Sequence, residues 1–176
     1  MSDLKEYLAQ KRRAALAKME AARANPAKTQ VKAQVRVAGR SGMREIRIRD
    51  FQIVSDSPPD FAGYNLGPGS PEMQMGVLGS CMTHITLIQA ALRGVSLEAV
   101  SVEVTAENDP RALFPDSDDV VIVPHNIRYV LNIVSDEPPE VIAALHEAVE
   151  KACPILNLLA NPQVITGEVV HRKPGE

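Results

Sequence analysis

The chain has 176 residues, enough for one domain with its own hydrophobic core. A formal net charge of −3 provides no basic face for a phosphate backbone, and an aromatic content of 3% without Trp provides few rings for base stacking. Two cysteines are too few for a disulfide-stapled secreted domain. No run of 18 apolar residues is free of polar ones, and the N-terminus has no apolar signal core. We therefore expect a cytoplasmic protein that binds neither nucleic acid nor membrane.

The first segment is a predicted helix at residues 3–24, rich in Ala, Lys, Arg, Glu and Leu and ended by Asn25-Pro26. Its apolar residues fall only roughly on one face, which is typical of a solvated arm or a strut. The chain accordingly divides into a helical arm at residues 1–28 and a domain at residues 29–176. Recruitment of a partner by this arm, with the domain as scaffold, is an alternative.

Alternation of apolar and polar residues predicts strands after the arm. The first two regions, separated by the turn Gly39-Arg40-Ser41-Gly42, favour an antiparallel hairpin or meander. A turn-rich surface loop is expected at 55–69. The predicted strand regions are 31–37, 44–54, 100–104, 120–123, 127–134 and 163–170.

A long helix is predicted from Ser70 to Leu92, with Ser70 as N-cap, Pro71 at the first helical position and Gly94 as C-cap. Its middle is weakly polar on every side, which indicates a buried helix. Strands segregated from two helices indicate an α+β fold with an antiparallel sheet. One sheet cannot shield a helix that is apolar on all faces, so we expect a second copy of the chain to supply the other cover.

A second helix is predicted over residues 136–152, where Cys153-Pro154 interrupts it, and a short turn through Leu159 follows. Cys81, in the middle of the first long helix, is either an inert small hydrophobe or a nucleophile. Nucleophilic chemistry needs a thiolate, and Cys81 lies too far from the helix N-terminus for the dipole to supply one. A cation from elsewhere is required. Cys153 is the only other thiol that could condense with a sulfenic acid at Cys81.

Two segments resemble the osmotically inducible protein C (OsmC) and organic hydroperoxide resistance (Ohr) family, in its OsmC-like branch. They are GPGSPEMQMGVLGSCMTHITLIQAALRGV, which contains Cys81, and AVEKACPILNLL, which contains Cys153. The order of elements agrees over residues 31–170. The resemblance implies an intertwined homodimer with antiparallel sheets wrapped around two central cysteine-bearing helices. It also implies reduction of organic hydroperoxides or hydrogen peroxide by Cys81, resolution by Cys153, and a dithiol reductant such as a lipoylated protein. We expect no cofactor and no metal.

The resemblance also assigns roles to Arg40 and Glu72. Arg40 would hold Cys81 as thiolate and donate to the peroxide oxygens, and Glu72 would orient the guanidinium. Without the resemblance, Arg40 is a solvated turn residue and Glu72 a partner of the helix dipole. On a straight helix Glu72 and Cys81 differ by about 180° and roughly 13 Å. We therefore expect Glu72 to act on Cys81 of the partner chain.

Several alternatives use the same residues. His84, one turn after Cys81, is either a proton donor or polar wall of the pocket, or a satisfied core histidine, of which we favour the latter. A zinc site made by Cys81, His84, His146 and Cys153 is disfavoured, since the second pair lies two turns apart. A non-catalytic protein, acting as a redox sensor or as a binder of a small apolar ligand in a Met-lined cleft, is the main alternative to the peroxidase.

Overall fold

The computed structural model describes residues 3–114 and 119–175. The element order is mixed α+β, as expected, with antiparallel pairing in both sheets. The elements are α1 (Asp3–Ala24), β1 (Gln34–Ala38), β2 (Met43–Ile48), β3 (Phe51–Ser55), a 3-10 turn (Pro59–Phe61), α2 (Ser70–Arg93), β4 (Ala99–Glu107), a 3-10 turn (Pro110–Leu113), β5 (His125–Val134), α3 (Pro139–Ala152) and α4 (Pro154–Ala160).

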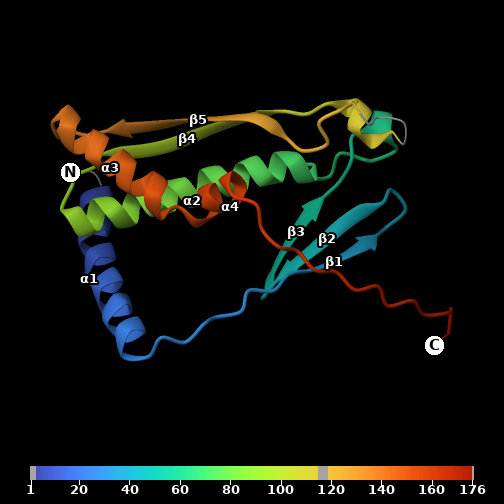
Figure 1. Cartoon of the computed structure of the whole chain (residues 1–176), viewed down its shortest axis with the longest axis horizontal. Coiled ribbons are helices and arrows are strands. Elements are labelled where there is room, and N and C mark those ends of the chain that lie inside the picture. The colour runs from blue at the N-terminus through green and yellow to red at the C-terminus, as the bar shows by residue number, and fades with distance from the viewer. Residues whose placement is uncertain (1–2, 115–118, 176) are drawn as a thin grey trace.

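The core lies around α2, which packs on β4, α1, α3 and α4. The long β4–β5 hairpin covers one side of α2, α3 and α4 run beside it, and α1 crosses its C-terminal end (Figure 1). Alternate residues of β4 face inward, and Gly79 of α2 lies where the helix approaches this strand. A Cβ at Gly79 would be 3.4 Å from the Val104 side chain, so a small residue permits this close packing. The buried residues are Leu8, Leu78, Met82, Ala90, Ala91, Val95, Leu97, Leu145, Val149 and Cys153.

The first sheet is a meander of β1, β2 and β3, which extends away from α2 (Figure 1). The strand region expected at 44–54 is two strands, because the chain turns at Arg49-Asp50 with Arg49 in the left-handed conformation (φ 53°). The first strand begins at Gln34 rather than Val31. The α+β class and the meander are therefore confirmed, with altered strand limits.

Two predicted strands are wrong for the single chain. Residues 120–123 and 163–170 have no strand pairing, and their apolar side chains, such as Ile122 and Val164, are exposed. Alternating apolar residues give a segment β propensity, but a strand also needs a neighbouring edge to pair with. Conversely, the expected turn through Leu159 is the short helix α4.

The ends of α2 match the sequence signals within one residue. The N-cap is Gly69 rather than Ser70, and Gly94 ends the helix in the left-handed conformation at φ 74°. α2 is long and apolar enough to span a membrane by length and composition alone, contrary to the expectation that no segment qualifies. In the fold this segment is the central helix of an α+β domain, and that role accounts for its composition.

Much apolar surface is uncovered in one chain. The chain exposes 13617 Å², whereas a folded monomer of 19.1 kDa exposes about 8,400 Å². α2 itself is buried on only part of its circumference, so the expectation of a fully buried helix is not met within one chain. The exposed apolar side chains include Val35, Val37, Phe51, Val77, Val130, Val164, Ile165 and Val169.

The loop between β3 and α2 is organised by the buried carboxylate of Asp56. Its oxygens accept hydrogen bonds from the backbone N–H groups of Ser57 (2.8 Å), Tyr64 (3.0 Å) and Leu66 (3.3 Å). Gly63 is needed for this close winding, since a Cβ there would lie 1.8 Å from the carbonyl oxygen of Ser57. The loop therefore delivers the chain to the start of α2 along a defined path.

We predict that Asp56→Asn lowers the Tm at neutral pH and that this difference shrinks in acid. Burial alone would raise the pKa of Asp56, but the three backbone donors and Arg44 outweigh it and lower the pKa. A folded-state pKa below the unfolded value of about 3.9 stabilises the fold above that pH, and the contribution is lost as the pH falls through the folded pKa. Thermal unfolding across pH measures this. Asp60→Asn on the same loop is the exposed control, and equal neutral-pH Tm values for the Asp56 variant and wild type would contradict the prediction.

Candidate functional site

The two cysteines come together where α2 meets the break between α3 and α4. Cys81 lies in the middle of α2 and is half-buried, whereas Cys153 follows α3, caps α4 and is fully buried. Both are free thiols. They are close enough that the side chain of Cys153 acts on the titration of Cys81. The helix break at Pro154 therefore turns the second thiol toward the first.

The environment of Cys81 within one chain disfavours the thiolate. Burial raises the pKa of Cys81 most, the backbone N–H of Ile155 lowers it, and the thiol of Cys153 raises it again. Within the described part of the chain, no arginine or lysine is among the groups that shift this pKa. A cation that stabilises a Cys81 thiolate must therefore come from a surface other than the groups that surround Cys81 in one chain.

Arg40 is not brought to Cys81 in one chain. It is exposed in the β1–β2 turn, between Gly39 (φ 71°) and Gly42 (φ 74°). The turn lies away from the middle of α2 (Figure 1). Among the described residues, its guanidinium has no hydrogen bond or ion-pair partner. The role assigned to Arg40 stays a prediction.

Glu72 is engaged at the start of α2, where its Oε2 accepts a hydrogen bond from the backbone N–H of Gly69 at 2.6 Å. A carboxylate at this place also meets the positive end of the helix dipole. Glu72 and Cys81 border the same shallow groove of 530 Å³, which follows the uncovered face of α2. At 100° per residue they lie on opposite edges of that face. The other residues that line it include Met73, Gly76, Val77, Ser80 and His84.

The prediction of a satisfied core histidine at position 84 is wrong, because His84 is exposed on the open face of α2. The pKa of His84 is lowered, first by partial desolvation and then by the positive charges of Lys11 and Lys18 on α1. The ring is consequently neutral at physiological pH. The remaining alternative, a proton donor or polar wall of the groove, agrees with this position.

The four residues of the zinc site that the sequence analysis disfavoured, Cys81, His84, His146 and Cys153, do not converge on one point. His84 is on the open face of α2, and the Nε2 atom of His146 is 2.7 Å from the hydroxyl of Tyr129. The parts of the chain that the structure describes contain no group of three or more His, Cys, Asp or Glu residues placed to hold a metal ion.

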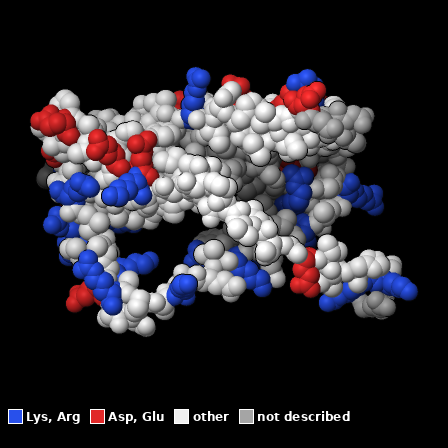
Figure 2. All heavy atoms as spheres, viewed as in Figure 1, with Lys and Arg blue, Asp and Glu red and all other residues white. Residues whose placement is uncertain are grey.

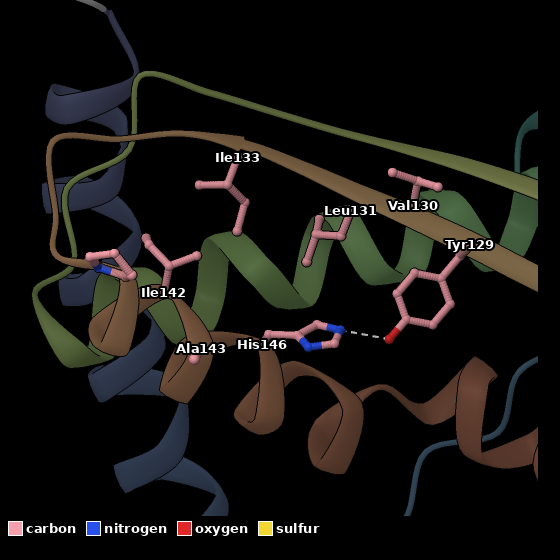
Figure 3. Close-up of a pocket in the computed structure, with 8 residues that line it drawn as sticks. Tyr129, Val130, Leu131, Ile133, Ile142, Ala143 and His146 are labelled. Atoms are coloured by element: carbon pink, nitrogen blue, oxygen red, sulfur yellow. Dashed lines mark hydrogen bonds between the residues drawn. The ribbon is translucent and has the colours of Figure 1, made fainter.

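A second cavity, which the sequence did not reveal, lies between β5 and α3 and measures 660 Å³ (Figure 3). Tyr129 points from β5 toward α3, and its hydroxyl donates to Oε1 of Glu150 at 2.6 Å. Because the hydroxyl has one proton, His146 must donate to it through Nε2–H. The i,i+4 spacing of His146 and Glu150 was visible in the sequence, but only the packing of β5 on α3 brings Tyr129 between them.

Comparison with known proteins identifies the fold. The sequence profile of OsmC-like proteins matches residues 63–168. The solved structures that resemble this one include an OsmC-like protein from Mycoplasma pneumoniae, 17% identical, with a TM-score of 0.66 over 76% of this chain and 89% of that one. An organic hydroperoxide resistance protein OsmC from Legionella pneumophila, 18% identical, has a TM-score of 0.53 over 76% and 90%.

A third similar structure is an OsmC-like protein of unknown function from Vibrio cholerae, 13% identical, with a TM-score of 0.54 over 74% and 93% of the two chains. No curated protein matches the sequence. At these identities the similar structures establish the fold.

We predict that Tyr129 ionises later than an ordinary tyrosine. Burial, the hydrogen bond to Glu150 and the negative charge of that carboxylate raise the pKa of Tyr129. In a titration followed by phenolate absorbance, Tyr129→Phe should remove the last transition. Glu150→Gln should move that transition to lower pH because it removes the negative charge, whereas Glu147→Gln, exposed on the same helix, should not. An unchanged final transition in Tyr129→Phe would contradict the prediction.

Proposed function

The chain belongs to the OsmC-like family, and on that premise we propose that it is a cytoplasmic thiol-dependent peroxidase that reduces organic hydroperoxides or hydrogen peroxide. The observation that carries the proposal is the pairing of its only two thiols, one bordering an open groove and the other buried behind it. A nucleophile must meet the peroxide, and its resolving partner need meet only the nucleophile. The unequal exposure of Cys81 and Cys153 suits these two tasks.

The proposed chemistry has three steps. The Cys81 thiolate attacks the terminal peroxide oxygen, the O–O bond breaks, and the alkoxide leaves as an alcohol after taking a proton. The product is a sulfenic acid on Cys81. The thiol of Cys153 then displaces the hydroxyl, which leaves as water, and forms a disulfide. An external dithiol, such as a lipoylated protein, returns two electrons and two protons by thiol–disulfide exchange.

A homodimer with shared active sites is part of the proposal. One chain leaves the open face of α2 uncovered and, within the described residues, the edge strands β1, β3, β4 and β5 each paired on one side only. Its exposed area exceeds that of a typical folded monomer by about 5,000 Å². Association would bury apolar surface and pair exposed strand edges. A second copy can also supply the missing cation, since Arg40 is exposed on a turn and unpartnered among the described residues of its own chain.

A redox sensor or ligand binder is the second candidate function. The raised pKa of Cys81 within one chain favours the ligand binder, because a protonated thiol reacts slowly with peroxide and a sensor needs the same reactive thiolate as a peroxidase. The two functions differ in turnover: a sensor forms its disulfide once, whereas a peroxidase consumes many equivalents of peroxide when a dithiol is present.

We expect Cys81→Ser to abolish peroxide consumption in the presence of a dithiol, because no other described thiol borders the groove. Cys153→Ser should allow the first reaction and then lose activity as Cys81 oxidises to sulfinic acid. Peroxide consumption and the intact mass of the protein report both outcomes. Undiminished multiple turnover by Cys81→Ser would refute the peroxidase, and a single turnover by wild type would favour the sensor.

We expect Arg40→Gln to shift the pH midpoint of Cys81 alkylation upward and to lower the peroxidase rate by roughly 100-fold, as loss of a preorganised charge does. The reason is that a nearby guanidinium favours the thiolate. Arg47→Gln is the matched control, since Arg47 is an exposed arginine of the same sheet whose side chain binds Gln52. Equal effects of the two substitutions would exclude a specific role for Arg40.

A shared site predicts complementation between inactive chains. Co-expressed Cys81→Ser and Glu72→Gln chains should recover activity in mixed dimers, because each mixed dimer has one site with an intact cysteine and the other chain's intact glutamate. Differently tagged chains isolate the mixed species. If isolated mixed dimers have no more activity than the parent variants, Glu72 does not act across the interface.

A further inference from the structure

One tyrosine hydroxyl joins the β4–β5 hairpin to the helix that ends before Cys153. The hydroxyl of Tyr129 donates to Oε1 of Glu150 at 2.6 Å and accepts from Nε2 of His146 at 2.7 Å, a bond that Figure 3 shows. His146 and Glu150 lie four residues apart, so one oxygen atom of β5 is bonded to two successive turns of α3. Directional bonds of this kind fix the rotation of a helix, whereas apolar packing alone does not.

The α3 end of this link lies close to Cys153. Glu150 is three residues before Cys153, or about 4.5 Å along the helix axis. The side-chain amide of Asn157 donates to the carbonyl oxygens of both residues, at 2.9 Å for Glu150 and 2.8 Å for Cys153. These bonds tie Glu150 and Cys153 together across the break at Pro154. A shift of Glu150 relative to β5 must therefore move the buried thiol as well.

The β5 end of the link lies over the part of α2 that carries Cys81. Tyr129 is directly opposite Val104 in the β4–β5 ladder, so the two side chains lie on the same face of the hairpin. A Cβ on Gly79 would be 3.4 Å from the Val104 side chain. Gly79 is two residues before Cys81, or about 3 Å along α2. The cross-strand pair of Val104 and Tyr129 thus contacts both helices within one turn of a cysteine.

The geometry of a disulfide makes the position of α3 important. Its two Cβ atoms lie about 3.5–4.5 Å apart and its dihedral angle is restricted, so a small displacement of one thiol takes it out of reach of the other. Cys81 packs against the buried cluster that contains Cys153. The α3 residues in that cluster, Leu145 and Val149, contribute burial but no directional bond. The hydroxyl of Tyr129 provides the directional contact.

We propose that Tyr129 is a positioning residue for a disulfide between Cys81 and Cys153. Its hydroxyl holds α3 in one rotation against β5 and so keeps the buried thiol within reach of Cys81. Glu150 takes part as a hydrogen-bond acceptor, so its oxygen atom matters rather than its negative charge. The consequence for peroxide turnover rests on the proposed peroxidase, whereas the effect on disulfide formation does not.

The direct test measures the disulfide at equilibrium and needs no peroxide. The reduced protein is incubated with glutathione and glutathione disulfide, and each glutathione disulfide that oxidises the two thiols releases two molecules of glutathione. Alkylation and intact mass give the oxidised fraction, and from it the effective concentration of one thiol at the other. Tyr129→Phe keeps the ring and removes the hydroxyl. It should lower this effective concentration about fivefold to tenfold, as loss of a hydrogen bond to a charged group does.

Two substitutions of Glu150 separate the hydrogen bond from the charge. Glu150→Gln keeps an acceptor oxygen and should retain the wild-type effective concentration, whereas Glu150→Ala should lose as much as Tyr129→Phe. Glu150 is exposed, so this pair carries the test if Tyr129→Phe does not fold. Acidic side chains lie over α3 (Figure 2), and Glu147→Ala, exposed on the same helix, is the matched control. Tyr64→Phe, which changes an exposed tyrosine, is the second control.

Three results would overturn the proposal. An unchanged effective concentration in Tyr129→Phe and Glu150→Ala would show that the hydroxyl does not position the thiol. An equal fall in Glu150→Gln and Glu150→Ala would show that the negative charge acts instead. An equal fall in the two controls would show a general loss of structure rather than a specific contact.

Peroxide then separates this proposal from the peroxidase. In a single turnover, Tyr129→Phe should form the sulfenic acid on Cys81 at the wild-type rate and form the disulfide more slowly, by the factor measured at equilibrium. More Cys81 should then be oxidised to sulfinic acid by further peroxide. A slower first reaction with unchanged disulfide formation would contradict the positioning role. If wild type consumes no peroxide but the effective concentration still falls in Tyr129→Phe, the peroxidase is refuted and the positioning role stands.

Discussion

The chemistry proposed for this fold depends on the ionisation of the Cys81 thiol. Cys81 lies in an apolar helix, where desolvation raises its pKa and only the backbone N–H of Ile155 opposes that effect. The nearby thiol of Cys153 raises the pKa further. A single chain thus holds the two thiols together in a form that is poorly reactive. The site acquires a nucleophile only if a cation arrives from another surface, and the proposed dimer offers the exposed arginine of the β1–β2 turn.

The backbone conformation at the end of α3 sets the position of Cys153, the proposed resolving cysteine. Proline disfavours helical geometry in the preceding residue, so Cys153 leaves the helix with ψ 110° and caps α4 instead. The side-chain amide of Asn157 donates to the carbonyl oxygens of Glu150 (2.9 Å) and Cys153 (2.8 Å), which satisfies acceptors freed by the break. The same turn of α3 holds Tyr129 through Glu150. The buried thiol therefore has a defined position on a rigid junction.

The open face of α2 carries the candidate nucleophile and is also the face that the proposed dimer would cover. The groove along it places Cys81 between Glu72 and His84. α1 crosses the C-terminal end of the same helix and contributes Leu4 and Leu8 to the core (Figure 1).

The sequence by itself determined the local structure: α1, the limits of α2 within one residue, the Cys-Pro break, the meander and the α+β class. Each depends on caps, prolines, glycines or periodicity, which act over a few residues. The predictions of strands at 120–123 and 163–170 were wrong, because a strand needs the edge of a neighbouring strand to pair with. A local sequence pattern does not show whether such an edge is present. The meeting of Cys81 with Cys153, the bonding of Tyr129 to Glu150 and the exposure of His84 were decided only by the tertiary structure. Those contacts join segments tens of residues apart, and their free energies depend on burial and charge that arise when the elements pack.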